Sequence, residues 1–110
     1  MKILKKVSVL GTEYRIIEDN CNNDPLLQNS FGYTDYTSKK IVITDFQKEE
    51  IEIEDVAKYR KQVIRHELIH AFLCESGLHE NCEWHNEEMV DWLATQAPKL
   101  QKIFKETEYI

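Results

Sequence analysis

Residues 66–70 read His-Glu-Leu-Ile-His, a spacing that can build a metal site. On a helix, positions four apart lie one turn apart on the same face. His66 and His70 can therefore reach one zinc ion together and leave it further positions for a third ligand and a water. Glu67 lies beside His66, where its carboxylate can take a proton from that water. The motif predicts a hydrolytic zinc centre with Glu67 as general base.

The two histidines have an alternative interpretation, as ordinary residues on an exposed helix face, because a five-residue match also arises by chance. The residues around the motif are apolar: Val63, Ile64, Leu68, Ile69, Ala71 and Phe72. They indicate a mostly buried helix, and a buried histidine needs a polar partner, which a metal ion supplies. We therefore favour the zinc interpretation.

A second acidic motif, Asn86-Glu87-Glu88-Met89-Val90-Asp91, follows after a short loop. A carboxylate from a second, antiparallel helix is a sensible third zinc ligand, and we expect Glu87 in this role. Glu88 is its rival, because a register slip of one residue would exchange the two. Asp91 shares a face with Glu87 and can accept a hydrogen bond from a zinc histidine. The helix dipole also favours acidic residues in any first turn, whatever the function.

Cys74, His79, Cys82 and His85 form a separate group of potential metal ligands. Their spacing matches none of the common structural zinc patterns, which keep paired ligands at both ends. We therefore do not expect a second zinc ion there. His79 or His85 remains an alternative third ligand to the zinc of His66 and His70.

The first half of the chain has the alternation of strands. Segments 3–9 and 13–17 predict a hairpin around a turn at Gly11, and segments 31–36 and 40–44 predict two further strands. We expect these to form an antiparallel sheet of three to four strands with one covered face.

The second half has helical periodicity. Apolar residues recur from about Ile53 to residue 75, and Gly77 can end that helix. A second helix is expected from Asn86 as N-cap to about Ala97, and Pro98 can open a third segment. The sequence thus predicts one α+β domain over residues 1–110, with a long active-site helix after the sheet and one or two C-terminal helices.

The two motifs together resemble the gluzincin arrangement of the thermolysin-like metallopeptidases. This resemblance implies that His66, His70 and Glu87 bind zinc, that Glu67 is the base and that Asp91 supports a zinc histidine. The layout, with HELIHAFL and then NEEMVDWLATQ, is also similar to small zincin-like proteins of bacteria and phages and to metallopeptidase domains of the ImmA/IrrE type. The resemblance covers about residues 55–97 and implies a zincin-like fold. We expect no counterpart in residues 1–110 of the second domain of the larger enzymes, with its histidine or tyrosine acid.

Zincin enzymes typically bind the substrate backbone along an edge strand. The resemblance therefore implies that segment 31–36 or 40–44 is such an edge and pairs with an extended peptide. A donor for the tetrahedral oxyanion is also expected. The candidates, of similar weight, are Tyr33, Tyr36, His79 and His85.

Composition narrows the range of partners. The formal net charge of −6, from 20 acidic and 14 basic residues, argues against nucleic acid or an anionic membrane. No apolar run approaches the roughly 20 residues that span a bilayer. With three cysteines and no export signal, we expect free thiols in the cytoplasm.

Two functions follow as hypotheses. The first is hydrolysis of a peptide bond in a peptide or protein substrate by zinc-activated water. The second is a non-catalytic zinc-binding module with a regulatory or structural role, for which a fourth protein ligand such as His79 or Cys82 would be expected. Glu67 favours the first, because a purely structural site does not need that carboxylate.

Overall fold

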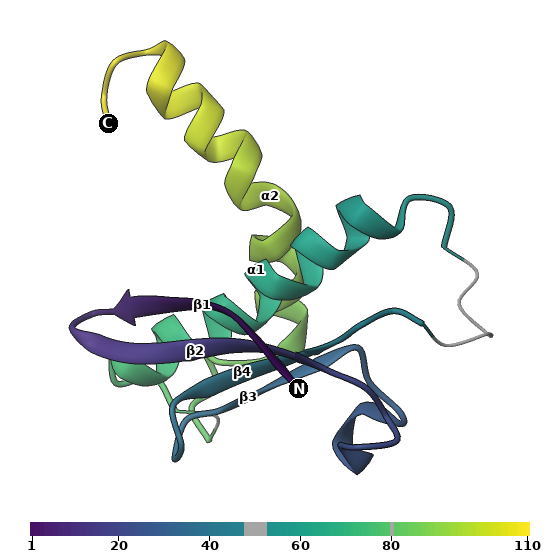
Figure 1. The fold of residues 1–110 in the computed structure, drawn as a ribbon. Helices are drawn as coiled ribbons and strands as arrows, with labels where there is room; N and C mark the ends of the chain where they lie inside the picture. The colour runs from purple at the N-terminus through teal and green to yellow at the C-terminus, as the bar shows by residue number, and fades with distance from the viewer. Residues whose placement is uncertain (48–52, 80) are drawn as a thin grey trace.

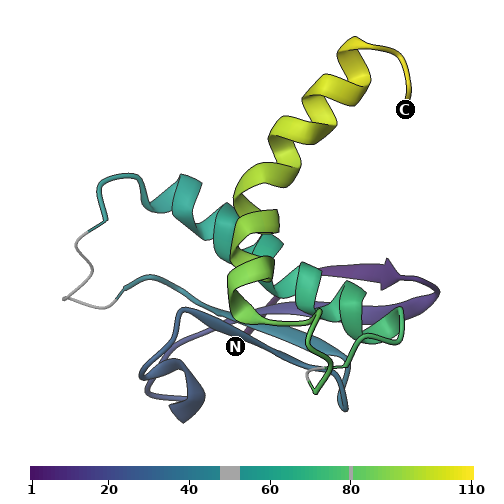
Figure 2. The same ribbon diagram turned by 180° about the vertical axis from the view of Figure 1, so that it is seen from behind.

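The computed structural model describes residues 1–47, 53–79 and 81–110. Along the chain the elements are β1 (Lys2–Val9), β2 (Thr12–Asp19), the 3-10 helix η1 (Pro25–Leu27), β3 (Gly32–Asp35), β4 (Lys40–Thr44), α1 (Val56–Glu75) and α2 (Glu87–Glu106). The strands form one sheet, α1 lies across it, and α2 crosses α1 before its C-terminal half projects away (Figures 1 and 2). The predicted α+β order, sheet first and helices after, is confirmed.

The sheet has the order β1-β2-β4-β3 and is mixed rather than antiparallel. β1 pairs with β2 and β3 with β4 in antiparallel fashion, but β2 and β4 pair in parallel, with Ile16 opposite Ile41. The prediction of a wholly antiparallel sheet is therefore wrong at this pair. The continuous apolar run Ile41-Val42-Ile43 suits the central place of β4, which is buried on both faces. Its direction follows from β3, which lies between β2 and β4 in the chain and pairs with β4 at the sheet edge, so that β4 runs parallel to β2.

Each face of the sheet has its own apolar cluster. Tyr14, Ile16, Ile41 and Ile43 lie on the face toward α1, where Val63 and Ala71 join them. On the opposite face Ile17 and Val42 pack with Leu27 of η1. Successive strand residues point to opposite faces, so β3 also divides its side chains between α1 and the far side.

Helix α1 begins after Asp55, whose side chain caps the backbone N–H of Lys58, and ends before Gly77, which has a φ of 98°. A positive φ at this position is typical of a helix C-terminus and favours glycine. The predicted helix over residues 53–75 thus begins three residues later than expected. Its buried residues include Glu67 and His70 among the apolar ones.

Helix α2 continues through Pro98 to Glu106, where the sequence suggested a new segment. A proline inside a helix removes the N–H that would bond the carbonyl four residues earlier. That carbonyl belongs to Ala94, and it accepts a hydrogen bond from Arg65 Nε of α1 at 2.8 Å. Arg65 therefore replaces the missing donor. Within the described residues, neither helix offers an apolar stretch long enough to cross a bilayer.

The contact between Arg65 and Ala94 gives a prediction for stability. Replacing Arg65 by Leu leaves the buried Ala94 carbonyl without this donor, and we expect a loss of about 1–2 kcal/mol in the free energy of unfolding. Adding Pro98→Ala restores a backbone N–H for the same carbonyl, so the Arg65→Leu change should cost less in that background. Chemical denaturation of the four proteins in the cycle measures this. If Arg65→Leu lowered the free energy of unfolding equally with Pro98 in place and in the Pro98→Ala background, Arg65 would not be the replacement donor for the Ala94 carbonyl.

Candidate metal centre

Three side chains from two helices converge on one point. His66 and His70 lie one turn apart on α1, and their Nε2 atoms are 3.1 Å from each other. The Glu87 carboxylate, from the first residue of α2, lies 3.0 Å from His66 Nε2 through Oε2 and 2.9 Å from His70 Nε2 through Oε1. The potential ligand atoms all lie within 4.8 Å of one another, so this group could hold a metal ion.

The start of α2 determines which carboxylate enters the site. Asn86 caps the helix by accepting a hydrogen bond from the Met89 backbone N–H at 2.9 Å. Val90 and Ala94 of the same helix are fully buried, and α2 packs against α1. This register directs the Glu87 carboxylate toward both histidines, whereas its rival Glu88 is not part of the cluster of potential ligands in the described residues.

Asp91 lies one turn beyond Glu87 and meets the other side of His66. Its Oδ1 is 2.8 Å from His66 Nδ1. A carboxylate accepts, so Nδ1 of His66 is the donor. The Nε2 atom of the ring then points to the space it shares with His70 and Glu87. The structure thus places Asp91 where the sequence suggested a partner for a metal-binding histidine.

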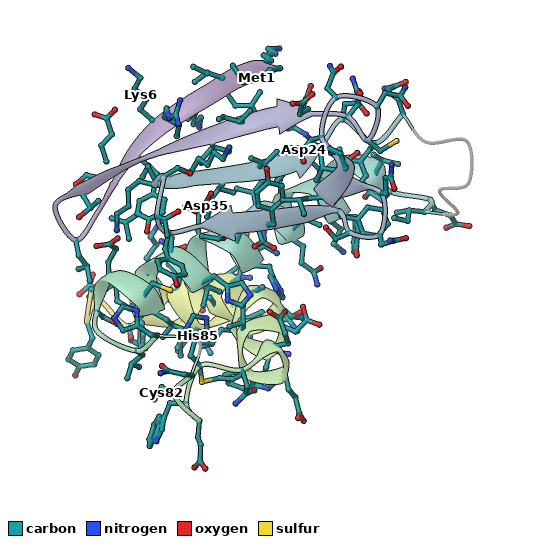
Figure 3. The ribbon with its side chains drawn as sticks, turned by 90° about the horizontal axis from the view of Figure 1, so that it is seen from below. Met1, Lys6, Asp24, Asp35, Cys82 and His85 are labelled. Atoms are coloured by element: carbon teal, nitrogen blue, oxygen red, sulfur yellow. The ribbon has the colours of Figure 1, made fainter. Side chains whose placement is uncertain are left out.

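His85 contacts His70 from behind. Its Nε2 is 2.6 Å from His70 Nδ1, on the side of the ring away from the proposed metal position, and its Nδ1 is 2.6 Å from the Leu78 carbonyl oxygen. The sequence suggested His85 as a third ligand or an oxyanion donor; the structure instead places it against the outer nitrogen of His70. Figure 3 labels His85 on the loop before α2, with Cys82 on the same loop.

Glu67 is buried, with 7 % of its surface exposed, and a residue of β3 contacts it. The Thr34 hydroxyl lies 3.0 Å from Glu67 Oε1 and 2.9 Å from the Glu67 backbone oxygen. The second carboxylate oxygen, Oε2, is 3.9 Å from His66 Nε2. The single Thr34 hydroxyl hydrogen is thus shared between the Glu67 backbone oxygen and Oε1, while Oε2 lies on the side of His66.

Thr34 was not singled out from the sequence. A threonine in a strand is ordinary, and only the packing of β3 beside α1 reveals its contact. Gly32 permits this close approach, because a Cβ there would lie 3.0 Å from the Val42 carbonyl oxygen and 3.2 Å from the Val63 side chain. A glycine at the start of a predicted edge strand is the one signal that could have pointed to a close contact.

The group lies in a groove of about 470 Å³. The groove is lined by residues 30–34 before and in β3, by residues of α1 that include Val63, His66 and Glu67, and by Glu87 and Asp91 of α2. The groove therefore brings the edge of the sheet and the potential metal ligands into one concave surface.

Of the two tyrosine candidates, Tyr33 is among the residues that line the groove, but its hydroxyl is engaged away from the histidines. Tyr33 packs with the cluster of Ile17, Leu27 and Val42 on the far face of the sheet, and its hydroxyl donates to Asp24 at 2.5 Å. Burial, together with this hydrogen bond, raises the pKa of the Tyr33 hydroxyl above its ordinary value. The Tyr36 side chain is exposed, and its ring centroid lies 6.3 Å from that of His79.

The Cys/His group of the intervening loop is not gathered around one point. Over residues 1–47, 53–79 and 81–110, the cluster of potential metal ligands is that of His66, His70 and Glu87. Cys74 is buried in α1 and Cys82 is half-buried, and neither of them nor Cys21 forms a disulfide. His79 is exposed.

Comparisons with known proteins do not assign this chain to a family. Protein-family models, curated proteins and solved structures give no match to this chain. The interpretation of the site rests on its residues and their geometry.

The position of Glu87 predicts how the site responds to mutation. Glu87→Ala removes a side chain that meets both histidines, and we expect zinc affinity to fall by about 100-fold or more, beyond the 10–100-fold typical of losing an outer partner. Glu88→Ala is the matched control and should leave affinity within about twofold, since surface changes away from a site have small effects. Competition titration against a chromophoric zinc chelator measures both. A larger loss of zinc affinity in Glu88→Ala than in Glu87→Ala would show that Glu88, and not Glu87, is the third ligand.

Proposed function

We propose that this protein is a zinc-dependent metallopeptidase that hydrolyses a peptide bond at the site of His66, His70 and Glu87. One observation carries the proposal: two Nε2 atoms and a carboxylate converge in a groove, and the Glu67 carboxylate faces the same space. A site that only held a metal ion would not require the Glu67 carboxylate.

The donor set suits zinc. Two imidazoles and one carboxylate are a common ligand set of catalytic zinc sites, which use three protein ligands and leave one position open. When bound, such an ion polarises a carbonyl and lowers the pKa of water at the site to about 7. Asp91 and His85 engage the Nδ1 atoms of the two histidines and so leave the Nε2 atoms directed at the ion.

Glu67 is suited to move the proton. Its Oε2 faces the metal position, where it can accept a proton from the attacking water. The same oxygen can then donate that proton to the leaving amine. Thr34 holds Oε1, which keeps the carboxylate in one orientation through both transfers. Precise orientation of a reacting group supplies much of an enzyme's rate enhancement.

The groove favours an extended peptide as substrate. β3 is the terminal strand of the sheet, and residues of and before β3 line the groove. An edge strand can add a further strand through main-chain hydrogen bonds, and such pairing binds peptides of varied sequence. A peptide laid along β3 would bring a backbone carbonyl past Glu67 and the histidines. The expected edge at residues 31–36 fits this role better than 40–44, because β4 is internal.

The non-catalytic module has less support. It would be favoured by a fourth protein ligand, but the metal-capable cluster in the described parts of the chain has three members. His85 meets the outer nitrogen of His70, and His79 is exposed. The buried Glu67 carboxylate, which Thr34 contacts, also has no use in a structural site, where it would only add a cost in stability.

Glu67→Gln tests the proton transfer. The amide keeps the size of the side chain but cannot accept the proton, so we expect zinc content to be unchanged and turnover to fall by about 10²–10⁴-fold. Cleavage of a fluorogenic peptide library, with zinc measured by mass spectrometry on the same samples, follows both. A cleaving preparation that Glu67→Gln leaves unaffected would refute the mechanism.

Thr34→Val tests the support of Glu67. Valine keeps the branched shape but lacks the hydroxyl, so the carboxylate loses a hydrogen bond of about 1.5–3 kcal/mol, equivalent to a roughly 10–100-fold loss of kcat if it is needed in the transition state. Thr34→Ser retains the hydroxyl and should keep most of the activity. Steady-state kinetics of the three proteins decides; equal kcat in Thr34→Val and the original protein would show that the contact has no role in turnover.

A further inference from the structure

His85 is a buried polar residue to which the proposed reaction gives no step. It is 4 % exposed and stands directly before Asn86, the N-cap of α2. Its two ring nitrogens have different partners, each at 2.6 Å: the Leu78 carbonyl oxygen at Nδ1 and His70 Nδ1 at Nε2. His85 thus lies between a backbone carbonyl and one of the potential metal ligands.

The carbonyl determines the direction of the hydrogen bonds. A carbonyl oxygen only accepts, so His85 Nδ1 carries a proton and donates it. In a neutral imidazole the other nitrogen is then an acceptor, so His85 Nε2 accepts from His70 Nδ1. His70 in turn has its proton on Nδ1 and a lone pair on Nε2. That lone pair points toward His66 and Glu87.

We propose that His85 is a positioning residue that holds His70 in its metal-binding orientation and tautomer. This inference rests on the proposed zinc site, since it gives His85 its purpose there. A metal-binding histidine typically donates its second ring nitrogen to a carboxylate, a carbonyl or water, and the partner fixes the tautomer. For His66 that partner is Asp91; for His70 it is the imidazole of His85.

A neutral partner suits this side of the site. The carboxylates of Glu67, Glu87 and Asp91 already surround the two histidines. A further buried carboxylate at position 85 would add a charge that is costly to remove from water. Imidazole accepts from His70 without bringing charge, and its own N–H is satisfied by Leu78. The loop backbone also holds His85, through its N–H to the Cys82 carbonyl at 3.0 Å.

The tautomers can be read in the metal-free protein. Long-range proton–nitrogen correlation spectra of the full chain with ¹⁵N-labelled histidine, recorded at mildly alkaline pH, distinguish a protonated from an unprotonated ring nitrogen. We expect a proton on Nδ1 of His70, and in His85 a proton on Nδ1 and an unprotonated Nε2. A proton on His70 Nε2 with a bare Nδ1 would overturn the inference.

Mutation then tests the effect on the metal, with Zn²⁺ alone as the ligand. His85→Leu removes the acceptor, and we expect zinc affinity to fall by about 10–100-fold, the range for losing an outer partner. His85→Gln can accept from His70 through its amide oxygen and donate to Leu78 through its NH₂ group, so it should restore most of the affinity. His79→Leu, an exposed histidine on the same loop, is the matched control and should bind as the original protein does.

The outcomes separate the two proposals. A folded His85→Leu protein that binds zinc as tightly as the original overturns the role of His85, and so does a His85→Gln protein as weak as His85→Leu. If His85→Leu fails to fold, the comparison of His85→Gln with the original protein and the tautomer spectra decide. If the original protein binds no zinc, the proposed function fails, while the spectra of the metal-free chain still show whether His85 sets the tautomer of His70.

Discussion

Two polar side chains, Glu67 and His70, lie on the face of α1 that is buried against the rest of the protein. Leaving such groups without partners would cost several kcal/mol each. Each has a partner from a different part of the chain: Thr34 of β3 for Glu67, and His85 of the loop before α2 for His70. The architecture around α1 can be understood as the set of elements that supply these partners.

The need to supply partners for buried polar groups also explains features of the neighbouring elements that an apolar core would not require. β3 must approach α1 closely, and Gly32 allows this. α2 must begin where Glu87 and Asp91 reach His66, and the Asn86 cap defines that start. Arg65, on the turn of α1 that carries the motif, supplies the donor that Pro98 removes, so α2 continues as one helix. The groove that holds the potential metal ligands and the protein core thus share helix α1.

Part of the candidate site could be predicted from the sequence, because helical spacing and helix capping depend on residues that are close together in the chain. The four-residue spacing of His66 and His70, and the N-cap before Glu87, predicted a cluster that the structure brings together. What depended on tertiary contacts was missed: the parallel pairing of β2 with β4, the contact of Thr34 with Glu67, and the place of His85 behind His70. Pro98 was misinterpreted for the same reason, because its compensating donor comes from another helix.

The central claim is that His66, His70 and Glu87 bind one zinc ion and leave it an open position. X-ray absorption spectroscopy of the zinc-loaded protein tests this most directly. We predict a first shell of nitrogen and oxygen atoms at about 2.0–2.2 Å, with the scattering pattern of two imidazoles. A sulfur shell at about 2.3 Å, which would bring in Cys74 or Cys82, or the pattern of a third imidazole, would contradict the account.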